Sequence, residues 1–102
     1  MGVMCEPGGF MPNHQWTLKD DLKILYIYKY GISNCCYSRN EIAEIIGVSV
    51  GSVGYRIANF KAIEGIGSAT HFSILSEEVH GKYNNLPEPA LKQLAFGSDK
   101  HD

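Results

Sequence analysis

The side chains best suited to binding chemistry in this 102-residue chain lie between Arg39 and Lys61. They carry guanidinium, ammonium, hydroxyl and amide groups, which donate hydrogen bonds to phosphate oxygens and to base edges in a DNA groove. The candidate DNA-binding residues are Arg39, Ser49, Ser52, Tyr55, Arg56, Asn59 and Lys61. Arg56 is preferred among them, because a guanidinium matches both phosphate and the O6/N7 edge of guanine.

Two features of the same stretch have alternative explanations. Asn59 is able to contact adenine through two hydrogen bonds, and an asparagine near a helix end is equally suited to stabilising a turn. Gly51 and Gly54 each lower helix propensity by roughly 1 kcal/mol. Their lack of a side chain permits a close approach either to a DNA backbone or to another helix. The sequence leaves both choices open.

Catalytic chemistry has no comparable signature. We find no Ser/His/Asp set, no glycine-rich phosphate loop and no metal-ligand spacing. The paired carboxylates of Asp20 and Asp21 are explained by helix capping. An odd number of cysteines with an adjacent pair (Cys5, Cys35 and Cys36) is typical of free thiols. We therefore predict that the protein is not an enzyme and uses no cofactor or metal.

Two short helices joined by a tight turn must position the candidate residues. Ser38 is placed to cap the first helix, and Glu41 completes a capping box three residues later. Gly47 ends that helix, because glycine enters the left-handed backbone region without steric cost. Ser49 caps the second helix, predicted over residues 49–61. Its buried side is expected to comprise Val50, Val53, Ile57 and Phe60.

A further helix precedes this pair. Thr17 is placed to cap it, Asp20 occupies the capping-box position, and Gly31 ends it. Apolar residues cover much of its circumference, which predicts packing on more than one side. The sequence therefore predicts a three-helix unit.

The three-helix pattern resembles two known groups. The Trp16-Thr17 start, the acidic residues in the next turn and the IA…G.S…SV..R core are similar to Myb-like or homeodomain-like trihelical DNA-binding domains. A second resemblance covers most of residues 16–86 and is to the helical N-terminal domain of HNH-type restriction endonucleases. Its matching positions are Ile24 to Tyr28, Ile46, Gly47, Ser49, Ser52, Val53, Arg56, Ile57, Asn59 and Phe60.

One departure from the second group bears on chemistry. An HNH nuclease carries a His-containing ββα-metal cassette after its helical domain, and this chain stops before such a cassette. His71, His80 and His101 have no paired His or Asn at nuclease-like spacing. The resemblance therefore implies a stand-alone DNA-recognition or assembly module, and not a nuclease.

The expected fold is all-α: a three-helix helix-turn-helix core with one or two additional C-terminal helices. The core spans residues 16–63 and follows a flexible arm over residues 1–15. Residues 64–97 form a helical extension that packs on the core or forms a dimer. Residues 98–102 form a tail.

Charge is divided unevenly between these parts. The net charge is −2, but residues 16–63 carry six basic and four acidic side chains. From residue 64 to the end there are three basic and six acidic side chains. The thin positive balance predicts weak DNA binding by a single copy, with a shallow salt dependence. It favours a homodimer, or a module within a larger assembly.

These observations predict a small sequence-specific DNA-binding protein of the transcriptional-regulator type, encoded by a phage or mobile element. Helix 49–61 would enter the major groove of double-stranded DNA. The alternative is a helical module that engages or inhibits a nucleic-acid enzyme, with the protein partner bound through the C-terminal region. No apolar run is long enough to span a bilayer and no secretory signal is present, so we expect a cytoplasmic location and no membrane partner.

Overall fold

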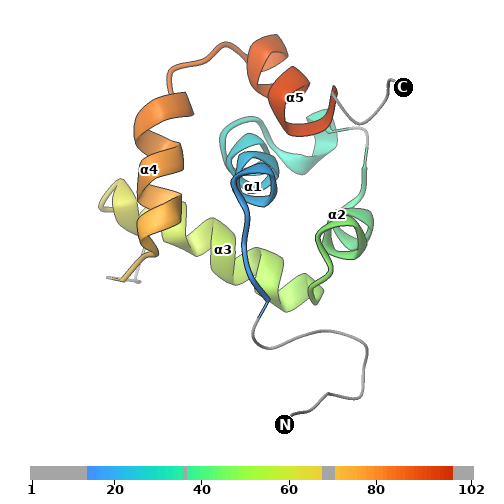
Figure 1. Cartoon of the computed structure of the whole chain (residues 1–102), viewed down its shortest axis with the longest axis horizontal. Coiled ribbons are helices and arrows are strands. Elements are labelled where there is room, and N and C mark those ends of the chain that lie inside the picture. The colour runs from blue at the N-terminus through green and yellow to red at the C-terminus, as the bar shows by residue number, and fades with distance from the viewer. Residues whose placement is uncertain (1–13, 36, 68–70, 98–102) are drawn as a thin grey trace, which may run out of the picture.

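The computed structural model describes residues 14–35, 37–67 and 71–97. In those ranges the chain forms five α-helices, one short 3-10 helix and no strand. The elements are α1 (Leu18–Tyr30), η1 (Ile32–Asn34), α2 (Arg39–Ile46), α3 (Val50–Ile63), α4 (Ile74–Tyr83) and α5 (Glu88–Phe96) (Figure 1). The predicted all-α architecture is confirmed. The predicted tail, and all but residues 14 and 15 of the predicted arm, lie outside the described residues.

Helix α1 lies at the centre of the molecule, with the other helices around it (Figure 1). It packs against α3, α4 and α5, and every residue from Asp21 to Ile27 is buried. A helix surrounded in this way needs apolar side chains around most of its circumference, as the sequence predicted. The buried apolar core comprises Leu22, Ile24, Leu25, Tyr26, Ile27, Ile42, Ala43, Ile46, Val48, Val53, Phe60, Val79, Leu91, Ala95 and Phe96.

Helix α1 and helix α2 both begin at a complete capping box. The Thr17 hydroxyl accepts a hydrogen bond from the backbone N–H of Asp20, whose carboxylate accepts one from the Thr17 N–H. Ser38 and Glu41 form the same reciprocal pair at the start of α2. These bonds satisfy backbone donors that the first turn of a helix leaves unpaired. Both predicted capping boxes are confirmed.

A short turn over residues 47–49 joins α2 to α3. Gly47 adopts the left-handed conformation with φ 96°, and its N–H donates to the Ala43 carbonyl, as does the N–H of Val48. Ser49 then caps α3 through its hydroxyl. The expectation that Val50 is buried is wrong, because its side chain is 39% exposed and Val48 in the turn is buried instead.

The two C-terminal helices share the core of the first three. Helix α4 packs on α1 and α3, and α5 packs on α1 (Figure 1). Val79 of α4 and Leu91 of α5 are almost fully buried. Within the described ranges, no helix has the length and apolar character needed to cross a membrane.

Candidate nucleic-acid interface

The outward side of α3 is a ridge of small, uncharged residues with one projecting aromatic ring. Gly51, Gly54 and Ala58 are spaced by three and four residues, and Tyr55 lies four residues after Gly51 and three before Ala58. The four residues therefore share one side of the helix. Tyr55 is 79% exposed, and a Cβ added to Gly54 would meet no atom within 4 Å. We call these four residues the α3 ridge. Another macromolecule could approach the backbone of α3 closely at this ridge.

Two of the predicted cations are available at the flanks of this helix. Arg39 is the first residue of α2 and Lys61 lies in the last turn of α3, and both side chains are exposed. Neither has a hydrogen-bond or ion-pair partner within the described part of the chain. Each could therefore bind a phosphate without breaking an internal contact.

The two predicted serines lie at the beginning of α3 and contact each other. The Ser49 hydroxyl accepts the hydrogen bond from the Ser52 N–H that caps the helix. It also donates to the Ser52 hydroxyl oxygen at 3.1 Å. Ser49 is thus committed to the cap, whereas Ser52 keeps its own O–H as a donor toward solvent.

The expectation that Arg56 reads a base requires correction, because its guanidinium lies inside the fold. Its Nε donates to Asp21 Oδ1 at 2.8 Å and its Nη2 donates to Asp21 Oδ2 at 2.9 Å. The guanidinium also stacks on the Trp16 ring, 4.5 Å from the centroid, and the side chain is only 12% exposed. Moving Arg56 onto DNA would leave a buried carboxylate unpaired, which is strongly unfavourable.

Asp21 has a different role from the helix-capping role expected of it. It is fully buried and holds α1, α3 and α4 together. In addition to the Arg56 pair, it accepts a hydrogen bond of 3.0 Å from the Ser76 hydroxyl of α4. Asp20 alone performs the capping. The sequence contained no local signal for this network, because its members come from three separate helices.

Asn59 stabilises a helix end, which is the second of the two roles considered for it. Its Nδ2 donates to the Tyr55 carbonyl at 3.1 Å, one turn earlier in α3. Its Oδ1 accepts a hydrogen bond of 2.6 Å from the Ser73 N–H at the start of α4. The side chain therefore ties α3 to α4, and its amide is not presented to a base.

A second polar cluster, which the sequence did not indicate, joins α1, α3 and α4. The Tyr28 hydroxyl contacts Glu64 Oε1 at 2.5 Å, and His80 Nε2 lies 2.8 Å from Glu64 Oε2. The Phe60 ring is stacked between the rings of Tyr28 and His80, with centroid distances of 6.1 and 6.4 Å. His80, expected to be an isolated surface residue, is instead half-buried and has a carboxylate partner.

This cluster shifts two pKa values in opposite directions. Burial, together with the hydrogen bond to the Glu64 carboxylate, raises the pKa of Tyr28 to about 12. The hydrogen bonds from Tyr28 and His80 lower the pKa of Glu64. Because the folded state holds the Tyr28 proton more tightly than the unfolded state, this contribution to stability is complete below pH 10.0 and is lost toward pH 12.

A spectroscopic titration tests the Tyr28 assignment. We expect one tyrosinate absorbance transition to occur near pH 12 in the wild-type protein and to be missing in Tyr28→Phe. Glu64→Gln should move that transition toward the ordinary value, because the neighbouring negative charge is gone. Wild-type and Tyr28→Phe curves that differ only near pH 10 would contradict the assignment.

Comparisons with known protein families, curated proteins and solved structures gave no match to this chain. Across residues 14–35, 37–67 and 71–97, no group of three His, Cys, Asp or Glu side chains is arranged to hold a metal ion.

Proposed function

We propose that this protein binds double-stranded DNA, with α2 and α3 acting as a helix-turn-helix and the α3 ridge entering the major groove. The observation that carries the proposal is the ridge itself. Val53 and Phe60 are fully buried on the inner side of α3, so the opposite side is left open to solvent. A major groove about 12 Å wide admits a helix, and a ridge of glycines and alanine brings its backbone close to the base edges.

The proposed contacts divide into base readers and phosphate anchors. Tyr55 and the Ser52 hydroxyl would face base edges from the first half of α3. Arg39 and Lys61 would bind phosphates, which fix the register of a helix in the groove. Arg56 contributes differently from first expected: by locking α3 onto α1, it keeps the ridge in one orientation.

The small number of cations sets the expected strength of binding. Each phosphate contact contributes about −0.9 to the slope of log affinity against log salt concentration. With Arg39 and Lys61 as the anchors, one copy would show a slope of only about −2. Specific recognition at physiological salt would therefore use two copies on a two-fold symmetric operator, as a small transcriptional regulator does.

The rival function is a protein-binding module. A ridge of glycine and alanine also permits close packing of another helix, and Tyr55 would then be an aromatic anchor of the kind common in protein interfaces. DNA is favoured because the ridge carries no acidic residue and because the two cations that flank it, Arg39 and Lys61, have no partner among the described residues.

A matched pair of glycine substitutions tests the proposal. Gly54 on the ridge and Gly81 in α4 both have open space where a Cβ would lie, and neither has a positive φ. Alanine at either position should stabilise its helix by about 0.5–1 kcal/mol. Only Gly54→Ala should weaken DNA binding, by about tenfold or more, because its methyl group would separate α3 from the groove.

The measurement combines thermal denaturation with fluorescence anisotropy, using duplexes obtained by in-vitro selection. Lys61→Ala should in addition reduce the salt slope by about 1. Failure to select any duplex at low salt would reject the proposal. Equal affinity of wild type, Gly54→Ala and Tyr55→Ala would also reject it, because the ridge would then make no contact with DNA.

A further inference from the structure

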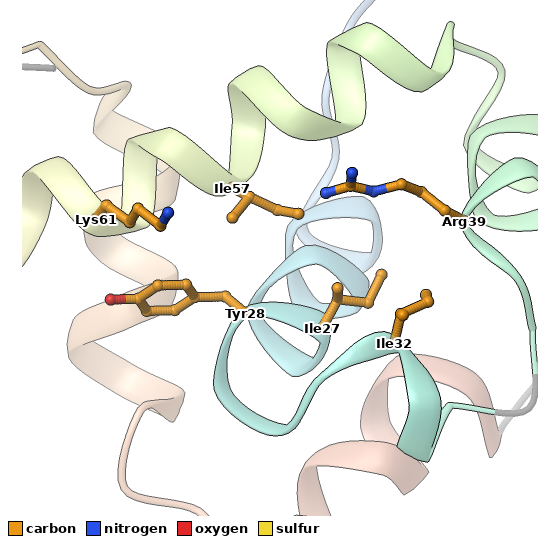
Figure 2. Close-up of a pocket in the computed structure, with 6 residues that line it drawn as sticks. All are labelled: Ile27, Tyr28, Ile32, Arg39, Ile57 and Lys61. Atoms are coloured by element: carbon orange, nitrogen blue, oxygen red, sulfur yellow. The ribbon is translucent and has the colours of Figure 1, made fainter. Parts of the chain in front are cut away.

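A pocket of about 430 Å³ lies where α1, η1, α2 and α3 meet, and its apolar interior has no part in the proposed DNA contacts. Its volume falls within the range of about 300–1,000 Å³ that is usual for small-molecule sites. The residues that line it are Ile27, Tyr28, Ile32, Arg39, Ile57 and Lys61 (Figure 2).

The inner surface of this pocket is apolar. Ile27 is buried, while Ile32 and Ile57 are half-buried and present the rest of their hydrocarbon surface to the pocket. Tyr28 contributes the side of its ring, because its hydroxyl points away from the pocket and contacts Glu64 (Figure 2). The inner surface therefore suits a hydrocarbon or aromatic group, with no polar group of its own to satisfy.

The rim of the pocket carries two positive charges with no internal counter-charge. Arg39 from α2 and Lys61 from α3 extend toward each other across Ile57 (Figure 2). Neither is paired within the described residues. Glu64, which follows α3, already contacts Tyr28 and His80 through its two oxygens. An anion placed between the two cations would thus gain charge-assisted hydrogen bonds that the protein itself does not supply.

We propose that this pocket binds an amphipathic carboxylate, an aromatic or medium-chain acid. Its carboxylate lies between Arg39 and Lys61, and its apolar body covers the three isoleucines. The site itself is independent of DNA binding. Its consequence rests on the proposed function: the ligand occupies the two cations that would anchor phosphates, so the acid and DNA compete.

The probe for the site is 1-naphthoate, with the neutral 1-naphthylmethanol as its matched control. On protein labelled at the isoleucine methyl groups, naphthoate should shift the NMR signals of Ile27, Ile32 and Ile57. The signal of Ile74, which is 74% exposed at the start of α4 and does not line the pocket, should stay in place. The alcohol should bind at least about tenfold more weakly, because it has no charge for the rim to bind.

Charge-removing variants locate the carboxylate. Arg39→Gln and Lys61→Gln should each weaken naphthoate binding by about fivefold. Both replace exposed side chains that have no partner in the part of the chain that the structure describes. Lys82→Gln, which removes an exposed charge on α4, should bind like the wild type. Unshifted methyl signals of the three pocket isoleucines, or equal binding of the acid and the alcohol, would overturn the site.

The same titration with bound duplex separates this inference from the proposed function. Saturating naphthoate should lower the DNA affinity of the wild-type protein. The same concentration of 1-naphthylmethanol should leave that affinity unchanged. Shifted pocket signals in a protein that binds no DNA uphold the site and reject the regulatory consequence. DNA binding that naphthoate leaves unchanged, although the pocket signals shift, also rejects that consequence.

Discussion

Replacing Arg56 by alanine should lower the free energy of unfolding by about 3–5 kcal/mol. The reason is the carboxylate that the substitution leaves behind: Asp21 is fully buried and would lose both hydrogen bonds from the guanidinium. The Ser76 hydroxyl alone would remain to solvate that charge. The variant would also lose the stacking of the guanidinium on Trp16. A loss of this size is a large share of the stability of a small domain.

Urea denaturation measures this loss, and Lys61→Ala is the matched control. Both substitutions remove a cation from α3, but Lys61 is exposed and has no partner among the described residues, so its loss should change stability by under about 0.5 kcal/mol. If Arg56→Ala is too unstable to fold, Arg56→Lys still keeps a charge without the two-bonded geometry, and it should be measurably destabilised. Equal stability of Arg56→Ala and Lys61→Ala would show that the guanidinium is at the surface.

Phe60→Ala should cost a similar amount, about 3–5 kcal/mol, for a different physical reason. The Phe60 ring is fully buried and lies between the rings of Tyr28 and His80, so its removal opens a cavity between α1, α3 and α4. The flanking Tyr28 and His80 side chains both contact Glu64, which limits how far they can close the gap.

The same denaturation assay applies, with Phe72→Ala as the control. Phe72 is 40% exposed, so its truncation should cost under about 1 kcal/mol. Phe60→Ala should also move the tyrosinate transition of Tyr28 toward lower pH, because loss of the neighbouring ring reduces the burial that raises the pKa of Tyr28. A Phe60→Ala variant as stable as Phe72→Ala would contradict the central position of this ring.

The parts of the fold that the sequence predicted are those set by near neighbours in the chain. The capping boxes at Thr17 and Ser38 each involve residues three positions apart, and the left-handed turn at Gly47 depends on one residue type. Such signals are complete within a few residues. Val50 was wrongly expected to be buried, because helical spacing predicts which side of a helix faces the core but not which turns along that side are covered by other helices.

The candidate site was predicted less well, because partners far away in the chain decide which of its side chains are buried in contacts and which are left exposed. Arg56 and Lys61 are both cations on α3, and only the fold brings Asp21, 35 positions away, to one of them. Asn59 likewise meets Ser73 across the connection to α4. The outward position of Tyr55 followed from helical spacing. The pocket could not be predicted from helical spacing, since four separate elements form it.

The central position of α1 has a consequence for how the chain is made. This helix leaves the ribosome first among those described, yet part of its apolar surface is covered by α5, whose last residue is Phe96. Until α5 has been synthesised, the side of α1 that α5 covers lacks this cover. Exposed apolar surface of this kind makes partly synthesised chains prone to aggregate. Synthesis of α5 is therefore the step that lets the chain bury this side of α1.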